Sequence, residues 1–269
     1  MNKLHKTLKA FGLIISKPYL LNSVLDEEGV KKKYVVSKYN LPNGLPSVDI
    51  LDLFPEFEDT IQPCSFLDGS SLPTDLALLK GLAKKIKCKD YFEIGTWRGE
   101  SVAVVAEFAE HCITLNLPDE EMRKKGLNND YIAMHCFFSK DLYNVKHIQA
   151  NSLTYDFTQL NQKFDLIFID GDHHSECIKS DTENAFKLLK DENSIIVWHD
   201  YGTSMETVRW NVLAGILDGC PEEKRKNIYH VSNTLCAFYT NKSLKTSVLK
   251  PNQKPDKYFS VHLKAHKIN

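Results

Sequence analysis

Two short apolar runs, LIFI at residues 166–169 and IIVW at residues 195–198, have no polar residue among them. A strand with one solvated face would alternate apolar and polar side chains, so these runs indicate strands that are covered on both faces. Helix-like segments separate the strand-like segments of this chain. Because such alternation builds a mainly parallel sheet between two layers of helices, we predict a doubly wound, Rossmann-like α/β fold.

The regular alternation begins after Ser71 and divides the chain into three parts. We predict a helical cap with a connector at 1–74, the α/β domain at 75–240, and a basic tail at 241–269. Helices are expected at 74–86, 100–110, 178–190 and 207–217, and strands at 91–95, 112–117, 145–150, 164–170 and 194–200. A hairpin of 227–231 with 235–240 is expected to close one edge of the sheet with an antiparallel strand.

The two ends of the chain have their own patterns. The first residues predict an amphipathic helix that ends before Pro18, with one apolar face and lysines elsewhere, and a second apolar set follows it: Leu4, Leu8, Phe11 and Ile15, then Leu20, Leu21, Val24 and Leu25. Such a basic helix either docks on its own protein or contacts a membrane or partner, and the sequence leaves both open. Residues 39–56, with three prolines, predict an extended connector. The tail from Asn241 has seven lysines and one acidic residue, and is expected to be solvated.

Composition narrows the classes of protein to be considered. The 269 residues carry a formal net charge of −1, so no overall field favours nucleic acid, and we predict no nucleic-acid partner. The seven cysteines include no CxxC pair, which is typical of free thiols in a reducing cytoplasm. No apolar run approaches the roughly 18 residues that span a bilayer. We predict a cytoplasmic protein, peripheral to the membrane if the first helix binds there, and leave a homo-oligomer open.

The stretch DYFEIGTWRGES at residues 90–101 runs from a predicted strand through two glycines into a predicted helix. In open α/β sheets, ligands bind beyond the carboxyl ends of the strands, where glycines let the backbone approach them. A dinucleotide fingerprint has GxGxxG, whereas Trp97 stands here at the position of the second glycine, which argues against NAD or FAD. The carboxylate of Glu93 suits a cation or a ribose hydroxyl. A tight turn with no ligand remains the alternative.

Together with two later stretches, FDLIFIDGDHHSECIKSD at 164–181 and SIIVWHDYG at 194–202, this pattern resembles the class I S-adenosylmethionine-dependent methyltransferases. It is most similar to the branch of sugar and natural-product O-methyltransferases, which have an IDGDH-type strand end and a later (D/H)DY strand end. The resemblance covers roughly residues 75–240. The N-terminal cap resembles leaders of bacterial methyltransferases from cell-surface glycan clusters. The resemblance implies O-methylation of a hydroxyl on a sugar, a glycan or a related small molecule.

The resemblance also implies a set of residues that bind S-adenosylmethionine. Glu93, Gly95 and Gly99 would line its methionine and ribose portions, and the full set is Glu93, Gly95, Thr96, Gly99, Ser101, Asn116, Asn151, Ser152 and Asp170. The family has an acidic residue at the ribose position, where this chain has Asn116. An amide still bonds a diol but contributes no charge, so weaker binding is expected. Asn151 and Ser152 are expected at the adenine.

Polar residues at two strand ends suggest the chemistry of the acceptor. Asp170, Asp172 and His173 follow the LIFI strand, and His199 and Asp200 follow the IIVW strand. The resemblance implies a divalent cation, magnesium or manganese, bound by Asp170, His199 and Asp200, with Asp172 as the base. A histidine in place of the family's acidic residue shifts the preference from magnesium toward manganese, iron or zinc. The alternative is that Asp170 caps a helix or holds substrate and His173 is the base, with no metal.

Other features keep two interpretations. The aromatic segment 118–140 either covers a bound cofactor or acceptor, or packs as ordinary helix. His174 and Asp165 are expected to be a surface histidine and a solvated strand-entry residue. Two other functions remain open: a non-catalytic, cofactor-binding Rossmann-like protein, and a membrane-associated scaffold in a glycan biosynthesis assembly.

Overall fold

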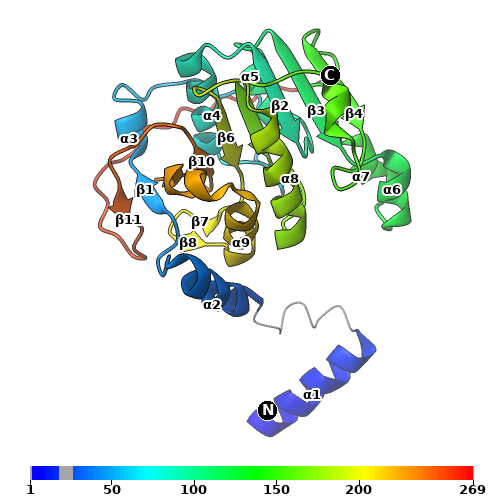
Figure 1. Cartoon of the computed structure of the whole chain (residues 1–269). Helices are drawn as coiled ribbons and strands as arrows, with labels where there is room; N and C mark the ends of the chain where they lie inside the picture. Colours follow the sequence, from blue (N-terminus) through cyan, green and yellow to red (C-terminus); the bar gives the residue numbers. More distant parts are fainter. Residues whose placement is uncertain (1, 18–26, 269) are drawn as a thin grey trace.

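The computed structural model describes residues 2–17 and 27–268, and within these ranges the chain forms a nine-stranded central sheet (Figure 1). The order of its strands is β11-β1-β9-β10-β6-β5-β2-β3-β4. Their bounds are β1 Pro46–Val48, β2 Asp90–Ile94, β3 His111–Asn116, β4 Val145–Gln149, β5 Leu166–Ile169, β6 Ile195–Trp198, β9 Ile228–Val231, β10 Ala237–Tyr239 and β11 Ser247–Val248. A separate pair is made by β7 Gly202–Ser204 and β8 Thr207–Val208.

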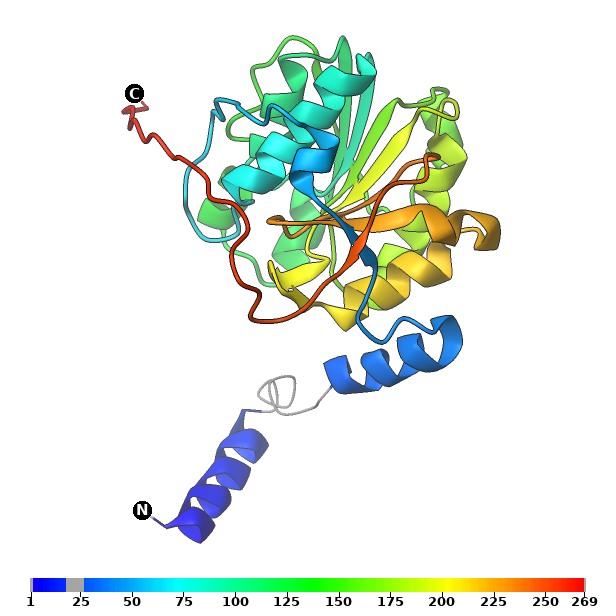
Figure 2. The same cartoon turned by 90° about the vertical axis from the view of Figure 1, so that its left-hand side faces the viewer.

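Helices cover both faces of the sheet, and the views in Figures 1 and 2 agree on the layers. The helices are α1 Lys3–Ser16, α2 Glu27–Tyr39, α3 Ile50–Leu53, α4 Pro73–Ile86, α5 Glu100–Ala106, α6 Asp119–Lys124, α7 Asn129–Ala133, α8 Ser175–Leu188 and α9 Trp210–Gly219. The apolar side chains of α4 and α5 pack on one face, against Tyr91 and Phe168. Those of α8 and α9 pack on the other, against Phe92 and Ile167. Adjacent residues of one strand thus enter different cores, which confirms the doubly wound α/β class.

Strands β4, β3, β2, β5 and β6 are parallel neighbours. From β2 the chain moves outward through β3 and β4, and it then returns to place β5 on the other side of β2. The strand order therefore reverses between β2 and β5. At such a switch point the loops that follow the two strands diverge and leave room for a ligand.

Both ends of the predicted domain continue into the same sheet. The predicted hairpin is formed by β9 and β10, but β10 is antiparallel to β6 and lies inside the sheet. Strand β1 from the connector pairs with β9, and β11 from the tail pairs antiparallel with β1 at the edge. The described residues of the tail are nevertheless exposed or half-buried, as expected of a solvated tail, and both residues of β11 are exposed. Residues 207 and 208, expected in a helix, form β8, and α9 begins at Trp210.

The N-terminal helices differ in their surroundings. Helix α1 confirms the predicted amphipathic helix, and none of its residues is buried. Helix α2 lies against α9 and buries Val35. The second apolar set, Leu20, Leu21, Val24 and Leu25, falls outside the described residues. Among the helices that the structure describes, none has both the length and the apolar composition to cross a bilayer.

Candidate active site

The turn between β2 and α5 holds the two glycines of the predicted ligand site. Gly95 and Gly99 have φ angles of +88° and +80°, which residues with a side chain rarely adopt. A Cβ added at Gly95 would collide with the carbonyl oxygen of Asp170 and lie 2.6 Å from the amide nitrogen of Gly171. The turn therefore touches the end of β5 at the switch point, and a larger residue at position 95 would separate them.

Glu93 is fully buried beneath this turn. Its Oε2 accepts a hydrogen bond of 2.6 Å from the hydroxyl of Tyr91, whereas its Oε1 has no partner among the described residues. Burial raises the pKa of Glu93 to about 8, against the opposing hydrogen bonds of Tyr91 and Ser101. A buried carboxyl group with one free oxygen can bind an ammonium or hydroxyl group of a ligand.

The ends of β2 and β3 are joined next to the turn. The backbone N–H of Thr96 donates to Oδ1 of Asn116 over 3.4 Å, so the two predicted cofactor residues lie together. The hydroxyl of Thr96 is buried and has no partner in the described part of the chain. Asn151, which follows β4, bonds residues near it and not the glycine turn. Its amide nitrogen donates to Glu121 over 3.2 Å, and its Oδ1 accepts from the N–H of Leu153.

Asp181 is a buried carboxylate that the sequence analysis did not single out. It lies in the middle of α8, and its hydrogen-bond partner is Ser152, after β4. Its Oδ2 would lie 3.7 Å from a Cβ added at Gly171, and its Oδ1 has no partner among residues 2–17 and 27–268. Burial raises its pKa to about 6. Asp181 therefore adds a polar group between the ends of β4 and β5.

A second polar cluster lies beyond β5 and β6. One ligand atom from each of Asp170, His173 and Asp200 lies within 4.8 Å of the other two. Nε2 of the half-exposed His173 is 2.6 Å from Oδ2 of Asp200. Asp200 has a φ of +55°, so the chain is already turning where it leaves β6. Burial would raise the pKa of Asp200, but His173 and His199 hold it well below its usual range.

His199 is held between two carboxylates. Its Nδ1 is 3.0 Å from Asp170 and its Nε2 is 3.1 Å from Asp75, a fully buried residue of α4. Burial alone would lower the pKa of His199, but Asp170, Asp200 and Asp75 together raise it well above its usual value. Both ring nitrogens thus contact carboxylates. One ligand atom from each of Asp75, His199 and Cys236 also lies within 4.8 Å of the other two, so these buried residues form a second group that could hold a metal ion. The role of His199 as a metal ligand stays a prediction, and His173 is the imidazole grouped with Asp170 and Asp200.

Asp172, the predicted base, bonds within its own loop. Its Oδ1 accepts from the backbone N–H of His174 over 2.8 Å and also contacts Nδ1 of the same residue. Burial would raise the pKa of Asp172, but these bonds outweigh it and lower the pKa. A carboxylate with a lowered pKa is a weak base, so the geometry favours His173 for this role.

A small cavity of about 10 Å³, which is about the space that one water molecule needs, lies at these strand ends. Its polar lining comes from the loops after β5 and β6, and its apolar lining comes from β5, β6, α8 and α9: Asp170, Asp172, His173 and His199, then Ile169, Trp198, Ile178 and Val212. The candidate bases Asp172 and His173 thus face the same space as Asp170 and His199, whereas Asp200 is not part of its lining.

Residues 92–201 match a family model described as a methyltransferase domain. This segment is similar to a methyltransferase domain. The matched residues run from β2 to the end of the loop after β6, so they include the glycine turn, both strand ends with their polar clusters, and α8.

Solved structures similar to this chain include an O-methyltransferase from Bacillus cereus in complex with SAH, with 18% identity, coverage of 83% of this chain and 94% of that chain, and a TM-score of 0.43. Another is the O-methyltransferase TomG from Streptomyces achromogenes in complex with SAM, with 15% identity, coverage of 80% and 91%, and a TM-score of 0.44. A putative caffeoyl-CoA O-methyltransferase from Staphylococcus aureus has 20% identity, coverage of 78% and 99%, and a TM-score of 0.43. Among curated proteins no match is found.

The aromatic segment 118–140, which lies inside the matched residues, packs directly on the glycine turn. The ring of Tyr131 lies 4.3 Å from that of Trp97, and His135 meets the same indole edge to face. The backbone N–H groups of Cys136 and Phe138 donate to the carbonyls of Trp97 and Arg98. The segment therefore holds the outer side of the turn by packing. This agrees with the interpretation that it packs against the protein; whether it also covers a cofactor or acceptor stays a prediction.

Asp75 and Asp181 are the site residues that the sequence analysis missed. Each lies within a helix. Asp75 accepts the N–H of Leu72 at 3.0 Å at the start of α4, but its other partners are distant in sequence: His199, and the N–H of Leu235 at 2.8 Å. No local pattern marks a single acidic residue in a helix as buried. The signal that could have found Asp181 is its position on the apolar side of α8, between Ile178 and Ala185.

Proposed function

We propose that the protein transfers a methyl group from S-adenosylmethionine to a hydroxyl of a small molecule, a sugar or a glycan intermediate. The observation that carries this proposal is the glycine turn at the switch point, inside the segment that matches a methyltransferase domain. We place the reaction in the cytoplasm, as composition predicts.

The residues at the switch point fit the proposed cofactor. Three buried oxygens around the turn lack partners within the described ranges, namely Oε1 of Glu93, the hydroxyl of Thr96 and Oδ1 of Asp181. Buried polar atoms are normally bonded, so these three can accept the ammonium, ribose hydroxyl and base amine groups of a nucleoside amino acid. When bound, S-adenosylmethionine supplies an electrophilic methyl group on a sulfonium.

On the acceptor side, His173 takes the proton and Asp200 supports its imidazole ring. A neutral His173 that donates its Nε2–H to Asp200 keeps the lone pair on Nδ1 for the proton of the acceptor hydroxyl. Asp200 stays ionised and stabilises the imidazolium that forms. Asp170, fixed by His199, provides a further acceptor that orients the hydroxyl.

A divalent cation fits the same cluster. Two carboxylates and an imidazole within 4.8 Å of one another form a mixed oxygen and nitrogen set, which suits manganese, iron or zinc better than magnesium. Asp170, His173 and Asp200 would hold the ion, which would lower the pKa of a bound hydroxyl. In that case the imidazole is a ligand, and His173 is not the base.

The test is methyl transfer from labelled S-adenosylmethionine to a panel of sugar nucleotides and phenols, with and without manganese, beside calorimetry with S-adenosylhomocysteine. The wild type should bind and transfer. His173→Asn should bind normally and turn over about 10²-fold more slowly, whereas Asp172→Asn should lose less. Binding without transfer to any acceptor would favour a non-catalytic cofactor-binding protein. No binding at all would refute the proposal.

A further inference from the structure

Helix α1 has one continuous apolar face. Leu4, Leu8, Phe11 and Ile15 recur at intervals of four, three and four residues, which places all four side chains on one side of a helix. The lysines of this region, Lys3, Lys6, Lys9 and Lys17, fall outside that stripe. The side chain of Asn2 accepts the N–H of His5 and caps the helix, so it begins at a defined residue.

This apolar face is exposed. The exposed fractions of Leu4, Leu8, Phe11 and Ile15 are 68%, 64%, 61% and 79%. Both views place α1 apart from the α/β body (Figures 1 and 2). Helix α2 shows the contrast, because it packs on α9 and buries Val35. Four large apolar side chains on one helix face are more than a solvated helix needs, so the face requires a partner.

The charge around α1 identifies the chemistry of that partner. Residues 1–25 contain four lysines and no aspartate or glutamate, although the whole chain has a net charge of −1. A surface that complements α1 is therefore apolar inside and negatively charged outside. A bilayer of anionic phospholipid has both properties, and cytoplasmic leaflets carry a negative surface potential.

The helix is too short to span such a bilayer. Its 14 residues are about 21 Å long, against a hydrocarbon core of about 30 Å. A basic amphipathic helix of this kind lies in the interface, with its apolar side chains between the lipids and its lysines among the headgroups.

We propose that α1 is a membrane-surface anchor that binds anionic phospholipid and holds the α/β body at the bilayer. This goes beyond the proposed methyl transfer and does not depend on it. An anchor of this kind would concentrate the protein where lipid-linked or surface-bound acceptors are found.

The test is flotation of the full chain with vesicles of phosphatidylglycerol and phosphatidylcholine, and with vesicles of phosphatidylcholine alone. The wild type should float with the anionic vesicles, and added salt should weaken its binding. Leu8→Ala/Phe11→Ala, which changes no charge, should lower the partition coefficient by at least about tenfold. Lys6→Gln/Lys9→Gln should weaken binding and its salt dependence while the apolar face is kept.

The matched control is Val261→Ala/Leu263→Ala, which truncates two apolar side chains in the tail that are also exposed. It should float like the wild type. All variants should melt at the wild-type temperature, because no residue of α1 is buried. The proposal is wrong if the wild type stays in solution, or if Leu8→Ala/Phe11→Ala floats equally well. It is also wrong if sedimentation without lipid shows self-association that this variant abolishes, because a second copy then covers the face.

Discussion

Two buried carboxyl groups, Glu93 in β2 and Asp181 in α8, each keep one oxygen without a hydrogen bond in the described part of the chain. A buried polar group left unpaired costs roughly 1–3 kcal/mol. Both groups lie at the strand ends where the chain would meet a ligand, and local rules are most often violated at functional sites. We therefore attribute the two unpaired oxygens to ligand binding, in which a bound molecule would supply the missing hydrogen bonds.

Glu93→Gln should change how stability depends on pH. The pKa of Glu93 is about 8 when folded and 4.5 in its reference state, so both states are protonated below about pH 4.5. As pH rises from about 4.5 to 8, Glu93 ionises in the unfolded chain but stays protonated in the folded chain. The free energy of unfolding therefore falls over this range and reaches its lowest value above pH 8. This fall is at most roughly 5 kcal/mol. Urea unfolding should show that the free energy of unfolding falls less between pH 5 and pH 9 in Glu93→Gln than in the wild type. An equal fall in both proteins would contradict the raised pKa of Glu93.

Asp181→Asn should have opposite effects on stability and binding. Removing a buried charge with one unbonded oxygen should raise the free energy of unfolding at pH 8 by about 1–3 kcal/mol. If the free oxygen accepts from the ligand, binding of S-adenosylhomocysteine should weaken by about tenfold or more. Calorimetry and urea unfolding measure the two effects. Glu183→Gln is the matched control, because it removes a charge from the half-exposed side of the same helix and should change neither.

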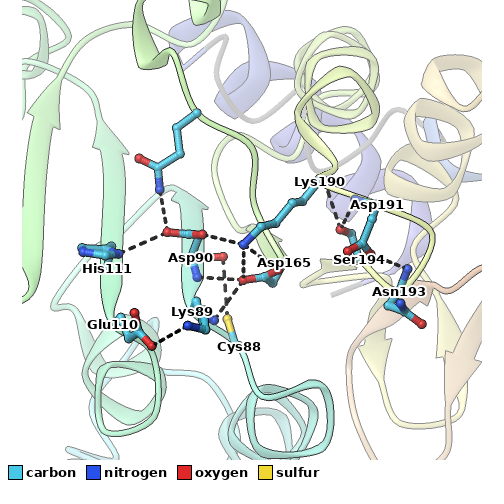
Figure 3. Close-up of polar contacts among 11 residues, drawn as sticks. Cys88, Lys89, Asp90, Glu110, His111, Asp165, Lys190, Asp191, Asn193 and Ser194 are labelled. Atoms are coloured by element: carbon cyan, nitrogen blue, oxygen red, sulfur yellow. Dashed lines mark hydrogen bonds and ion pairs between the residues drawn. The ribbon is translucent and has the colours of Figure 1, made fainter.

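At the scale of elements, the starts of the central strands are joined by a polar network at the edge opposite the candidate site. Figure 3 shows Asp165, the residue before β5, beside Asp90, Lys89 and Lys190. Oδ2 of Asp165 accepts the backbone N–H groups of Lys89 and Asp90, both at 2.9 Å, and Lys190 bridges Asp90 and Asp165. Asp165 was expected to be solvated, and that expectation is wrong because it satisfies two backbone donors.

Asp165→Ala should lower the free energy of unfolding by about 2–3 kcal/mol, since two donors at the start of β2 lose a charged acceptor. It should leave binding of S-adenosylhomocysteine unchanged, because the network lies at the other end of the strands. Glu110→Ala is the control, since its ion pair with Lys89 is largely exposed and contributes at most about 1 kcal/mol. Equal losses for the two variants in urea unfolding would show that the backbone bonds of Asp165 are unimportant.

The sequence predicted the elements that have a strong local pattern. The strands LIFI and IIVW and the helix from Pro73 were found because apolar periodicity marks them. Strands β1 and β11 were missed, because three and two residues are too short for any period and depend on pairing between residues 200 positions apart. The glycine turn was also predicted from a local pattern, the two glycines between a strand and a helix. The role of Asp75 could not be predicted, because it contacts His199 and Leu235 only after the sheet has folded.

At the scale of the whole molecule, the N-terminal region and the tail are part of the sheet and of its helical layer. Strand β1 lies between β9 and β11, so it covers an edge that β9 would otherwise expose. Helix α2 is bonded to both ends of α9: Glu28 accepts the N–H of Asn211 over 3.2 Å, and Tyr34 donates to Asp218 over 2.8 Å. The predicted limits 75 and 240 thus separate paired elements, although they enclose the residues that match the family model.

A fragment of residues 75–240 should therefore fail to fold as a stable unit, whereas a chain that lacks only residues 1–26 should keep the wild-type melting temperature. The shorter fragment loses β1, β11 and α2, which leaves β9 as an exposed edge and uncovers the apolar side of α9. Unpaired edges and exposed apolar faces promote aggregation. Thermal melting and size-exclusion chromatography should show aggregation or a broad transition for 75–240 and a single cooperative transition for 27–269. A monomeric 75–240 that melts like the full chain would mean that the paired ends contribute little, and that the sheet from β4 to β9 is stable without them.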